Sequence, residues 1–227
     1  MPDTDADSQT DDEFVRSREQ LRAAELDLML QRERVAQLRR DLPPGPVVED
    51  YVFEQVAGPG EVDHGEAIRL SELFSAPDRT VVLYHFMIGK AQGDACPMCT
   101  MWADGWAGVA GHLAERVDFA LVSGGPVGEL ADLADTRGWD DLPLLGAGDS
   151  TFKVDIGGED EQGHQWPFIS VYRLDGGQPR LTYSGGAHIT GDHWRGVDLL
   201  SPVWHLLDLT PEGRGDWIPS VSPSATP

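Results

Sequence analysis

The stretch from Thr80 to Val117, TVVLYHFMIGKAQGDACPMCTMWADGWAGVAGHLAERV, contains the only two cysteines of the chain. Its first part, Thr80 to Met87, is rich in β-branched, aromatic and other apolar residues, which predicts a buried strand. A loop containing Gly and Asp follows, and then Cys96-Pro97-Met98-Cys99 opens a segment with large apolar residues at helical spacing. The sequence therefore places a C-x-x-C pair at the junction between a strand and a helix.

The segments around this junction predict a β-α-β-α unit followed by a β-hairpin and a closing helix. One helix is expected after Cys96, with an apolar face formed by Met98, Trp102, Trp106, Val109 and Leu113. The later elements are strands at 117–123 and 142–145, a helix at 126–137, a segment at 146–165 that is mostly loop, hairpin strands at 168–174 and 179–184, and a helix at 199–209. A parallel crossover joined to an antiparallel hairpin predicts a thioredoxin-like α/β sandwich.

The N-terminal part of the chain has a different composition. Residues 1–12 are acidic and without periodicity, and we predict that they are disordered. Residues 13–42 predict a long helix with an apolar residue at every seventh position from Phe14 to Leu42, which packs either on its own domain or on a second copy in a homodimer. A proline-rich turn ends this helix, residues 43–214 form the predicted thioredoxin-like domain, and residues 215–227 form a loose tail.

The charge balance limits the classes of partner. The chain has 39 Asp and Glu residues against 17 Lys and Arg, a net charge of -22, which argues against binding to nucleic acid or to an anionic membrane surface. No apolar run approaches the roughly 20 residues of a membrane span, and the acidic N-terminus lacks the features of a secretory signal. We therefore expect a cytoplasmic protein, where a C-x-x-C pair is more often redox-active or metal-binding than a structural disulfide.

The position of the cysteine pair predicts thiol chemistry. Cys96 is expected at the N-cap and Pro97 at the first helical position, so the unpaired backbone donors and the helix dipole would stabilise a Cys96 thiolate. Cys99 lies one turn later, close enough to resolve a mixed disulfide. This predicts a thiol–disulfide oxidoreductase that needs no cofactor and acts on a protein or small-molecule disulfide. A thiol peroxidase of this fold carries a Pro and a Thr or Ser shortly before its reactive cysteine, and residues 89–95 contain none of these.

Three other hypotheses for the function of the chain remain open. A single C-x-x-C excludes a four-cysteine zinc site within one chain, but a mixed site for a soft ion such as Cu(I) is a second hypothesis. Its candidate ligands are Cys96, Cys99, His85, His164, His188 and His193. The third is a pair of inert buried cysteines, and the fourth is a non-catalytic dimeric interaction module built on the N-terminal helix.

Four further residues are candidates for shaping the site. In this fold the loop before the first hairpin strand packs against the cysteine pair, and here that loop contains Trp166-Pro167, whose peptide bond is either cis or trans. Trp102 and Trp166 would shape a docking surface with Pro167. Asp104 is either a proton acceptor for a thiol or a structural acid on the helix.

Several segments together resemble a known bacterial family. These are LYHFMIG, CPMCTMWADGW, GHLAERVDFALVS, Asp50-Tyr51-Val52-Phe53, Arg195-Gly196-Val197-Asp198 and HLLDLTP at 205–211. They are similar to the corresponding segments of domain-of-unknown-function family 899, and the resemblance extends over about residues 13–214. It implies a thioredoxin-like fold, and it implies no particular activity.

Overall fold

The computed structural model describes residues 4–56, 65–187, 196–197, 200–213 and 215–221. The chain forms two units, Met1–Pro43 and Pro44–Pro227, and each is described by itself. In both units the described helices include none that is long and apolar enough to cross a membrane.

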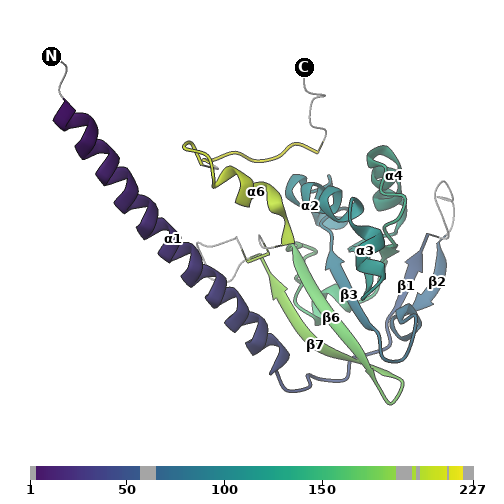
Figure 1. The fold of residues 1–227 in the computed structure, drawn as a ribbon. Coiled ribbons are helices and arrows are strands. Elements are labelled where there is room, and N and C mark those ends of the chain that lie inside the picture. The colour runs from purple at the N-terminus through teal and green to yellow at the C-terminus, as the bar shows by residue number, and fades with distance from the viewer. Residues whose placement is uncertain (1–3, 57–64, 188–195, 198–199, 214, 222–227) are drawn as a thin grey trace. The chain divides into compact units, whose positions relative to one another are not determined.

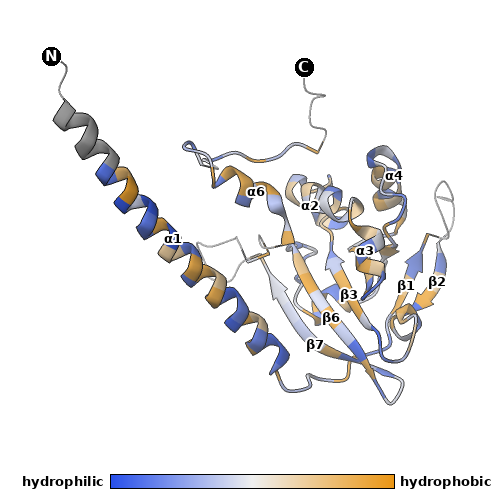
Figure 2. Ribbon diagram, viewed as in Figure 1, coloured by the Kyte–Doolittle hydropathy of each residue, from blue (hydrophilic) through white to orange (hydrophobic). Residues whose placement is uncertain are grey.

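The first unit is dominated by the helix α1 (Thr4–Arg40). It begins at Thr4, so residues 4–12, which we predicted to be disordered, are helical. These residues contain neither Gly nor Pro, the two residues with the lowest helix propensity. Apolar and polar stretches alternate along α1 (Figure 2). The homodimer contact through this helix stays a prediction.

Seven strands among the described residues of the second unit form one mixed sheet, ordered β2-β1-β5-β4-β3-β6-β7 (Figure 1). Strands β3, β4 and β5 are mutually parallel, whereas β6 pairs antiparallel with β3 and with β7, and β1 pairs antiparallel with β5 and with β2. The strands are β1 (Val52–Gln55), β2 (Glu66–Arg69), β3 (Thr80–His85), β4 (Asp118–Ser123), β5 (Leu144–Gly146), β6 (Phe168–Asp175) and β7 (Gln178–Gly186).

The order β4-β3-β6-β7, with a helical crossover between β3 and β4 and a helix after the hairpin, is the thioredoxin-like α/β arrangement that the sequence predicted. β5, β1 and β2 extend the sheet beyond β4. The helices of this unit are α2 (Pro97–Ala107), α3 (Ala110–Ala114), α4 (Gly128–Arg137), α5 (Phe152–Asp155) and α6 (Pro202–Leu207), and two 3₁₀ turns lie at Leu70–Leu73 and Lys90–Gln92.

One local prediction was wrong. The single helix expected after Cys96 is divided: α2 ends at Ala107, α3 begins at Ala110, and Val109 is 42% exposed instead of lying on an apolar face. Glycine at position 108 weakens the helix there, because glycine has a low helix propensity. The segment 146–165, predicted to be mostly loop, also contains the short helix α5.

The alternation of side chains along β3 divides the core into two clusters, one on each face of the sheet. Tyr84 belongs to the cluster under α2, with both cysteines and Trp102. Val81 and Leu83 belong to the other cluster, with Phe152 of α5. Helices α2 and α5 thus contribute to the two different clusters.

Candidate functional site

The two cysteines lie at the start of α2, next to the end of β3. Cys96 is the N-cap residue with extended backbone (φ −66°, ψ 122°), and Pro97 occupies the first turn. The backbone N–H of Cys96 donates to the carbonyl of Met87 at 3.0 Å, which ties the loop to the chain just beyond β3. Both cysteines are free thiols; Cys96 is 5% exposed and Cys99 is fully buried.

The two sulfurs have opposite acid–base character. Hydrogen bonds from the Cys99 thiol and from the backbone N–H groups of Cys99 and Met98 lower the pKa of Cys96 from 9.0 to about 7, against the opposing effect of burial. Burial, followed by interaction with Cys96, raises the pKa of Cys99 well above its ordinary value. Near neutral pH the pair therefore carries its negative charge on Cys96, the sulfur nearer to solvent.

Alkylation of Cys96 is expected to follow this pKa. Because only the thiolate attacks iodoacetamide, the rate should rise with pH through a midpoint at about 7 instead of 9.0. Mass spectrometry across a pH series measures the rate of alkylation. We expect one alkyl group per native chain, because Cys99 is fully buried. Cys96→Ser is the control and should show no fast phase. A wild-type midpoint near 9.0 would contradict the stabilised thiolate.

Tyr84 contacts the buried sulfur and was not identified as a site residue from the sequence. It lies in β3, is fully buried, and its hydroxyl donates to Cys99 Sγ at 3.2 Å. Its ring packs edge to face against Trp102 and Trp106, with ring centroids 5.9 and 4.6 Å away. Strict alternation along β3 from Leu83 could have indicated that Tyr84 faces the opposite side, toward the cysteine helix.

A small apolar pocket opens beside Cys96. Its volume is about 190 Å³, and it contains Cys96 but not Cys99 among its lining residues. The other lining residues are Met87, Met98, Trp102, Gln165, Trp166, Pro167 and Ala187. The structure therefore brings together Cys96 and three of the four residues that we predicted to shape the site.

The two tryptophans of this pocket differ in burial. Trp102 is fully buried, packs edge to face on Trp204 of α6 at 5.8 Å, and so forms the wall of the pocket instead of an exposed docking surface. Trp166 is 42% exposed and forms part of the rim. Its bond to Pro167 is trans, which leaves the cis alternative without support.

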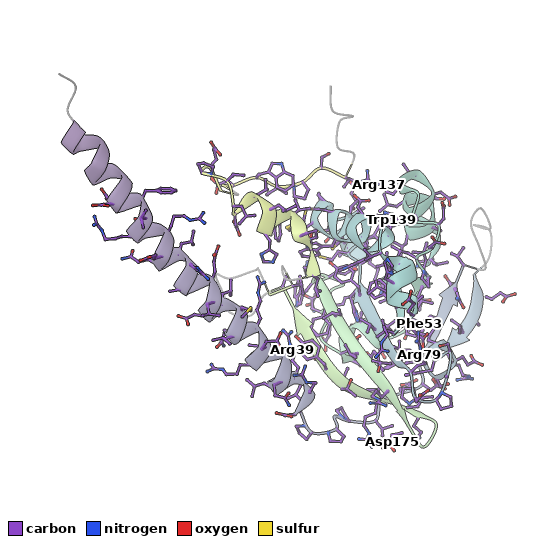
Figure 3. The ribbon with its side chains drawn as sticks, viewed as in Figure 1. Arg39, Phe53, Arg79, Arg137, Trp139 and Asp175 are labelled. Atoms are coloured by element: carbon purple, nitrogen blue, oxygen red, sulfur yellow. The ribbon has the colours of Figure 1, made fainter. Side chains whose placement is uncertain are left out.

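Asp104 is hydrogen-bonded to groups other than the thiols. Its carboxylate accepts hydrogen bonds from the guanidinium of Arg137, at 3.0 Å from Nε, and from the indole N–H of Trp139 at 2.9 Å. Arg137 and Trp139 lie at the same end of α4 (Figure 3). Asp104 therefore links α2 to the end of α4, and of its two predicted roles the structural one fits.

The histidines predicted as metal ligands do not join the cysteines where they are described. His85 is buried on the opposite face of the sheet, stacked on Phe152, and its Nε2 shares a hydrogen bond of 2.9 Å with Ser170 Oγ. The ring of His164 is largely exposed and pairs with Asp160 at 2.9 Å. His188 and His193 lie outside the described residues. Within the described ranges, no group of three or more His, Cys, Asp and Glu side chains could hold a metal ion.

A buried polar cluster of Lys153 and Gln165 binds the backbone that follows β3 and was missed by the sequence analysis. Lys153 of α5 is 1% exposed, and its Nζ donates to the Phe86 carbonyl at 3.1 Å and to Gln165 Oε1 at 2.7 Å. The amide of Gln165 donates in turn to the carbonyls of Ile88 and Gly89, at 3.1 and 3.0 Å. One signal was available, because Lys153 is one of only two lysines in the chain.

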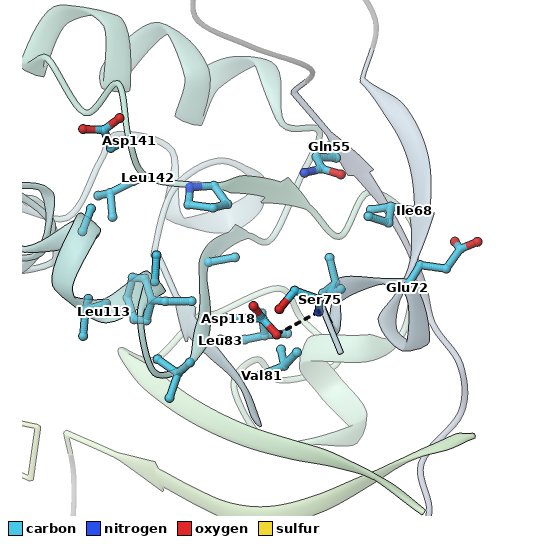
Figure 4. A pocket seen from close by; sticks show the side chains of 17 residues that line it. Gln55, Ile68, Glu72, Ser75, Val81, Leu83, Leu113, Asp118, Asp141 and Leu142 are labelled. Atoms are coloured by element: carbon cyan, nitrogen blue, oxygen red, sulfur yellow. Dashed lines mark hydrogen bonds between the residues drawn. The ribbon is translucent and has the colours of Figure 1, made fainter. Parts of the chain in front are cut away.

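A second cavity, of about 310 Å³, lies away from the cysteines. It is lined mainly by apolar residues of β3, β4 and α3, with Asp118 and Asp141 among its few charged residues (Figure 4). Asp118 is held there by Arg79 at 3.2 Å and by the backbone N–H of Ser75 at 3.0 Å. The cavity contains no sulfur nucleophile, so the thiol site is the one described above.

Several solved structures are similar to this chain at low identity. An uncharacterized conserved protein from Geobacillus kaustophilus is 16% identical over 66% of this chain and 72% of its own, with a TM-score of 0.43. A secreted Mycobacterium tuberculosis disulfide oxidoreductase, described as homologous to E. coli DsbE, is 14% identical over 67% and 92%, with a TM-score of 0.43. Enterococcus faecalis AhpC is 12% identical over 72% and 93%, with a TM-score of 0.48. Similarity at this level assigns no activity.

The sequence itself gives a clearer relationship. No curated protein matches the chain. The profile of a bacterial protein family of unknown function, DUF899, matches residues 4–223, which includes the cysteine pair, the sheet and all the helices described. This match agrees with the resemblance of the CPMCTMWADGW and YHFM segments. The chain therefore belongs to the bacterial family DUF899.

Proposed function

We propose that this protein is a thiol–disulfide oxidoreductase in which Cys96 attacks and Cys99 resolves. The observation that carries the proposal is the free dithiol at the start of α2, whose outer sulfur has a pKa lowered to about 7. A thiol with a pKa near ambient pH combines a large thiolate fraction with good nucleophilicity, which is the optimum for disulfide exchange.

The proposed reaction has two exchange steps. The Cys96 thiolate attacks one sulfur of a substrate disulfide, an S–S bond to Cys96 forms, and the other substrate sulfur leaves as a thiolate that takes up a proton. Cys99 then loses its proton and attacks the Cys96 sulfur, and the second substrate sulfur leaves. The substrate disulfide is reduced to two thiols, and the protein dithiol is oxidised to a disulfide. Turnover requires an external dithiol reductant.

The pocket beside Cys96 limits the substrate. Its volume of about 190 Å³ is below the roughly 300–1,000 Å³ of typical small-molecule sites, so it suits a single apolar group adjacent to a disulfide. Met87, Met98 and Trp102 would pack against that group. With a net charge of -22, the protein favours neutral or basic partners. We therefore expect a protein disulfide flanked by an apolar side chain, or a small apolar disulfide.

Reduction of insulin by dithiothreitol tests the proposal. Wild-type protein should accelerate the reaction in catalytic amounts, and Cys96→Ser should reduce the rate to that of dithiothreitol alone, because serine cannot attack the disulfide. Circular dichroism of the variant shows whether it remains folded. Equal acceleration by wild type and Cys96→Ser would rule the mechanism out.

A further inference from the structure

The buried lysine of α5, Lys153, has no direct acidic partner among the described residues. The Nζ of Lys153 donates only to neutral oxygens, of Phe86 and Gln165, and none of the ion pairs among the described residues includes it. The nearby Glu159 is bonded instead to Lys90, at 3.0 Å. A buried cation without a bonded counter-charge is costly, so its position calls for a reason beyond stability.

One peptide group joins this lysine to the buried sulfur. The Phe86 carbonyl and the Met87 N–H belong to the same peptide unit, which follows directly after β3. Lys153 binds the oxygen of this unit, and the N–H donates to Cys99, where it opposes the effect of burial on the pKa of that thiol. A cation on the carbonyl polarises the peptide and strengthens its N–H as a donor, since bonded groups in series reinforce one another.

We propose that Lys153 is a positioning residue that stabilises the Cys99 thiolate through the Phe86–Met87 peptide during resolution of the mixed disulfide. This inference rests on the proposed function. Resolution creates a negative charge on a fully buried sulfur, a place where only hydrogen bonds and nearby positive charge can replace water. Tyr84 supplies one hydrogen bond at 3.2 Å, Met87 supplies another, and Lys153 supplies the charge.

The charge state of Lys153 makes the inference testable by pH. The pKa of Lys153 is lowered from 10.5 to about 7, mainly by burial and to a lesser extent by the charge of Lys90, while Glu159 and Cys99 act in the opposite direction. Besides Lys153 and Cys99 themselves, other charged or titratable groups act on each of them. Glu159, Lys90 and His85 act on Lys153, and Cys96 and Tyr84 act on Cys99.

The expected pH dependence follows from counting protons. Two states of these side chains hold one proton between them: a Cys99 thiolate with a protonated Lys153, and a Cys99 thiol with a neutral Lys153. The reactive state is the one with the Cys99 thiolate, and its population rises as pH rises through about 7, the pKa of Lys153. Above that pH its population is constant, because the ratio of two states with the same number of protons does not depend on pH. Without the lysine, Cys99 must lose its proton at its own raised pKa, so the population of its thiolate keeps rising with pH.

Reaction with 5,5′-dithiobis(2-nitrobenzoate) in stopped flow separates the two exchange steps. The first equivalent of thionitrobenzoate reports attack by Cys96, and the second reports resolution by Cys99. We expect the wild-type second phase to level off above a pH of about 7, whereas that of Lys153→Met should keep rising beyond about pH 8.5, the ordinary pKa of a thiol, because the pKa of Cys99 is raised.

The size of the effect near neutral pH can be bounded. Each unit by which the pKa of Cys99 rises lowers its thiolate fraction about tenfold. The same unit raises the rate constant of the thiolate about threefold, because a more basic thiolate is more nucleophilic. Lys153→Met should therefore slow the second phase by at least about threefold for each pKa unit and leave the first phase present. Lys90→Met, which removes the other lysine, should move the levelling to higher pH, because Lys90 lowers the pKa of Lys153.

The outcomes distinguish this inference from the function beneath it. Absence of the first phase in wild type would refute the proposed function. A normal first phase with a wild-type second phase that rises without levelling would overturn the role of Lys153, even if Lys153→Met does not fold. The same conclusion would follow if Lys153→Met folded and kept the wild-type pH profile, because a merely structural lysine would leave that profile unchanged.

Discussion

A Cys99→Ser variant should react once with a disulfide substrate and then stop. Cys96 keeps its place at the start of α2 and its bonds from backbone N–H groups, so it can still form a mixed disulfide. Serine cannot displace the second substrate sulfur, because disulfide exchange requires a thiolate and serine has only a hydroxyl group. We therefore expect turnover to fall to the uncatalysed rate and one covalent adduct per chain to accumulate.

Intact mass spectrometry after incubation with an excess of a small disulfide measures this adduct. Wild-type protein should show the internal disulfide and little adduct, and Cys96→Ser should show neither product. Because Cys99 donates one of the hydrogen bonds that lower the pKa of Cys96, the adduct should form more slowly near neutral pH than the wild-type first step. An adduct on Cys99 in Cys96→Ser, at the rate of the wild-type first step, would reverse the assigned roles.

Trp102→Ala should destabilise the fold severely. The side chain is fully buried among both cysteines, Tyr84 and Trp204. Truncation of a buried tryptophan leaves a cavity, and the free energy of unfolding should fall by about 3–5 kcal/mol. Urea denaturation followed by circular dichroism at constant pH and in excess reductant measures the change.

Trp166→Ala is the matched control because it alters the same pocket from the rim. Trp166 is 42% exposed, so its removal should change the free energy of unfolding by less than about 0.5 kcal/mol. Its effect should appear instead as weaker binding of an apolar disulfide, with a higher KM and a smaller change in kcat. If both variants lost equal stability, the assignment of Trp102 to the core and Trp166 to the docking surface would be wrong.

Local patterns were sufficient to predict the centre of the fold. Strand β3, the start of α2 at Cys96, strand β4 and the hairpin β6–β7 all follow from runs of apolar residues and the turn signals between them. The thioredoxin-like topology follows from the order of these elements and the handedness of a parallel crossover. Cys96 was correctly expected at the N-cap, because that position depends on nearby residues alone.

Contacts distant in sequence were not predictable in the same way. Lys153 reaches a carbonyl 67 positions away, and its helix is only four residues long, too short to give a periodic signal. Asp104 is paired by residues 33 and 35 positions away. His85 lies one residue after Tyr84 but faces the other side of the sheet, so its proximity in sequence to the cysteines does not bring its ring to them.

The two sulfurs belong to the same apolar cluster that holds α2 on the sheet. Folding and electron transfer are therefore linked in one thermodynamic cycle. The difference in unfolding free energy between the oxidised and reduced proteins equals the amount by which folding makes the disulfide easier or harder to form. For a two-electron couple, about 1.4 kcal/mol corresponds to about 30 mV. Unfolding curves of the two forms thus measure whether the native state acts as a reductant or an oxidant, before any electron donor is known.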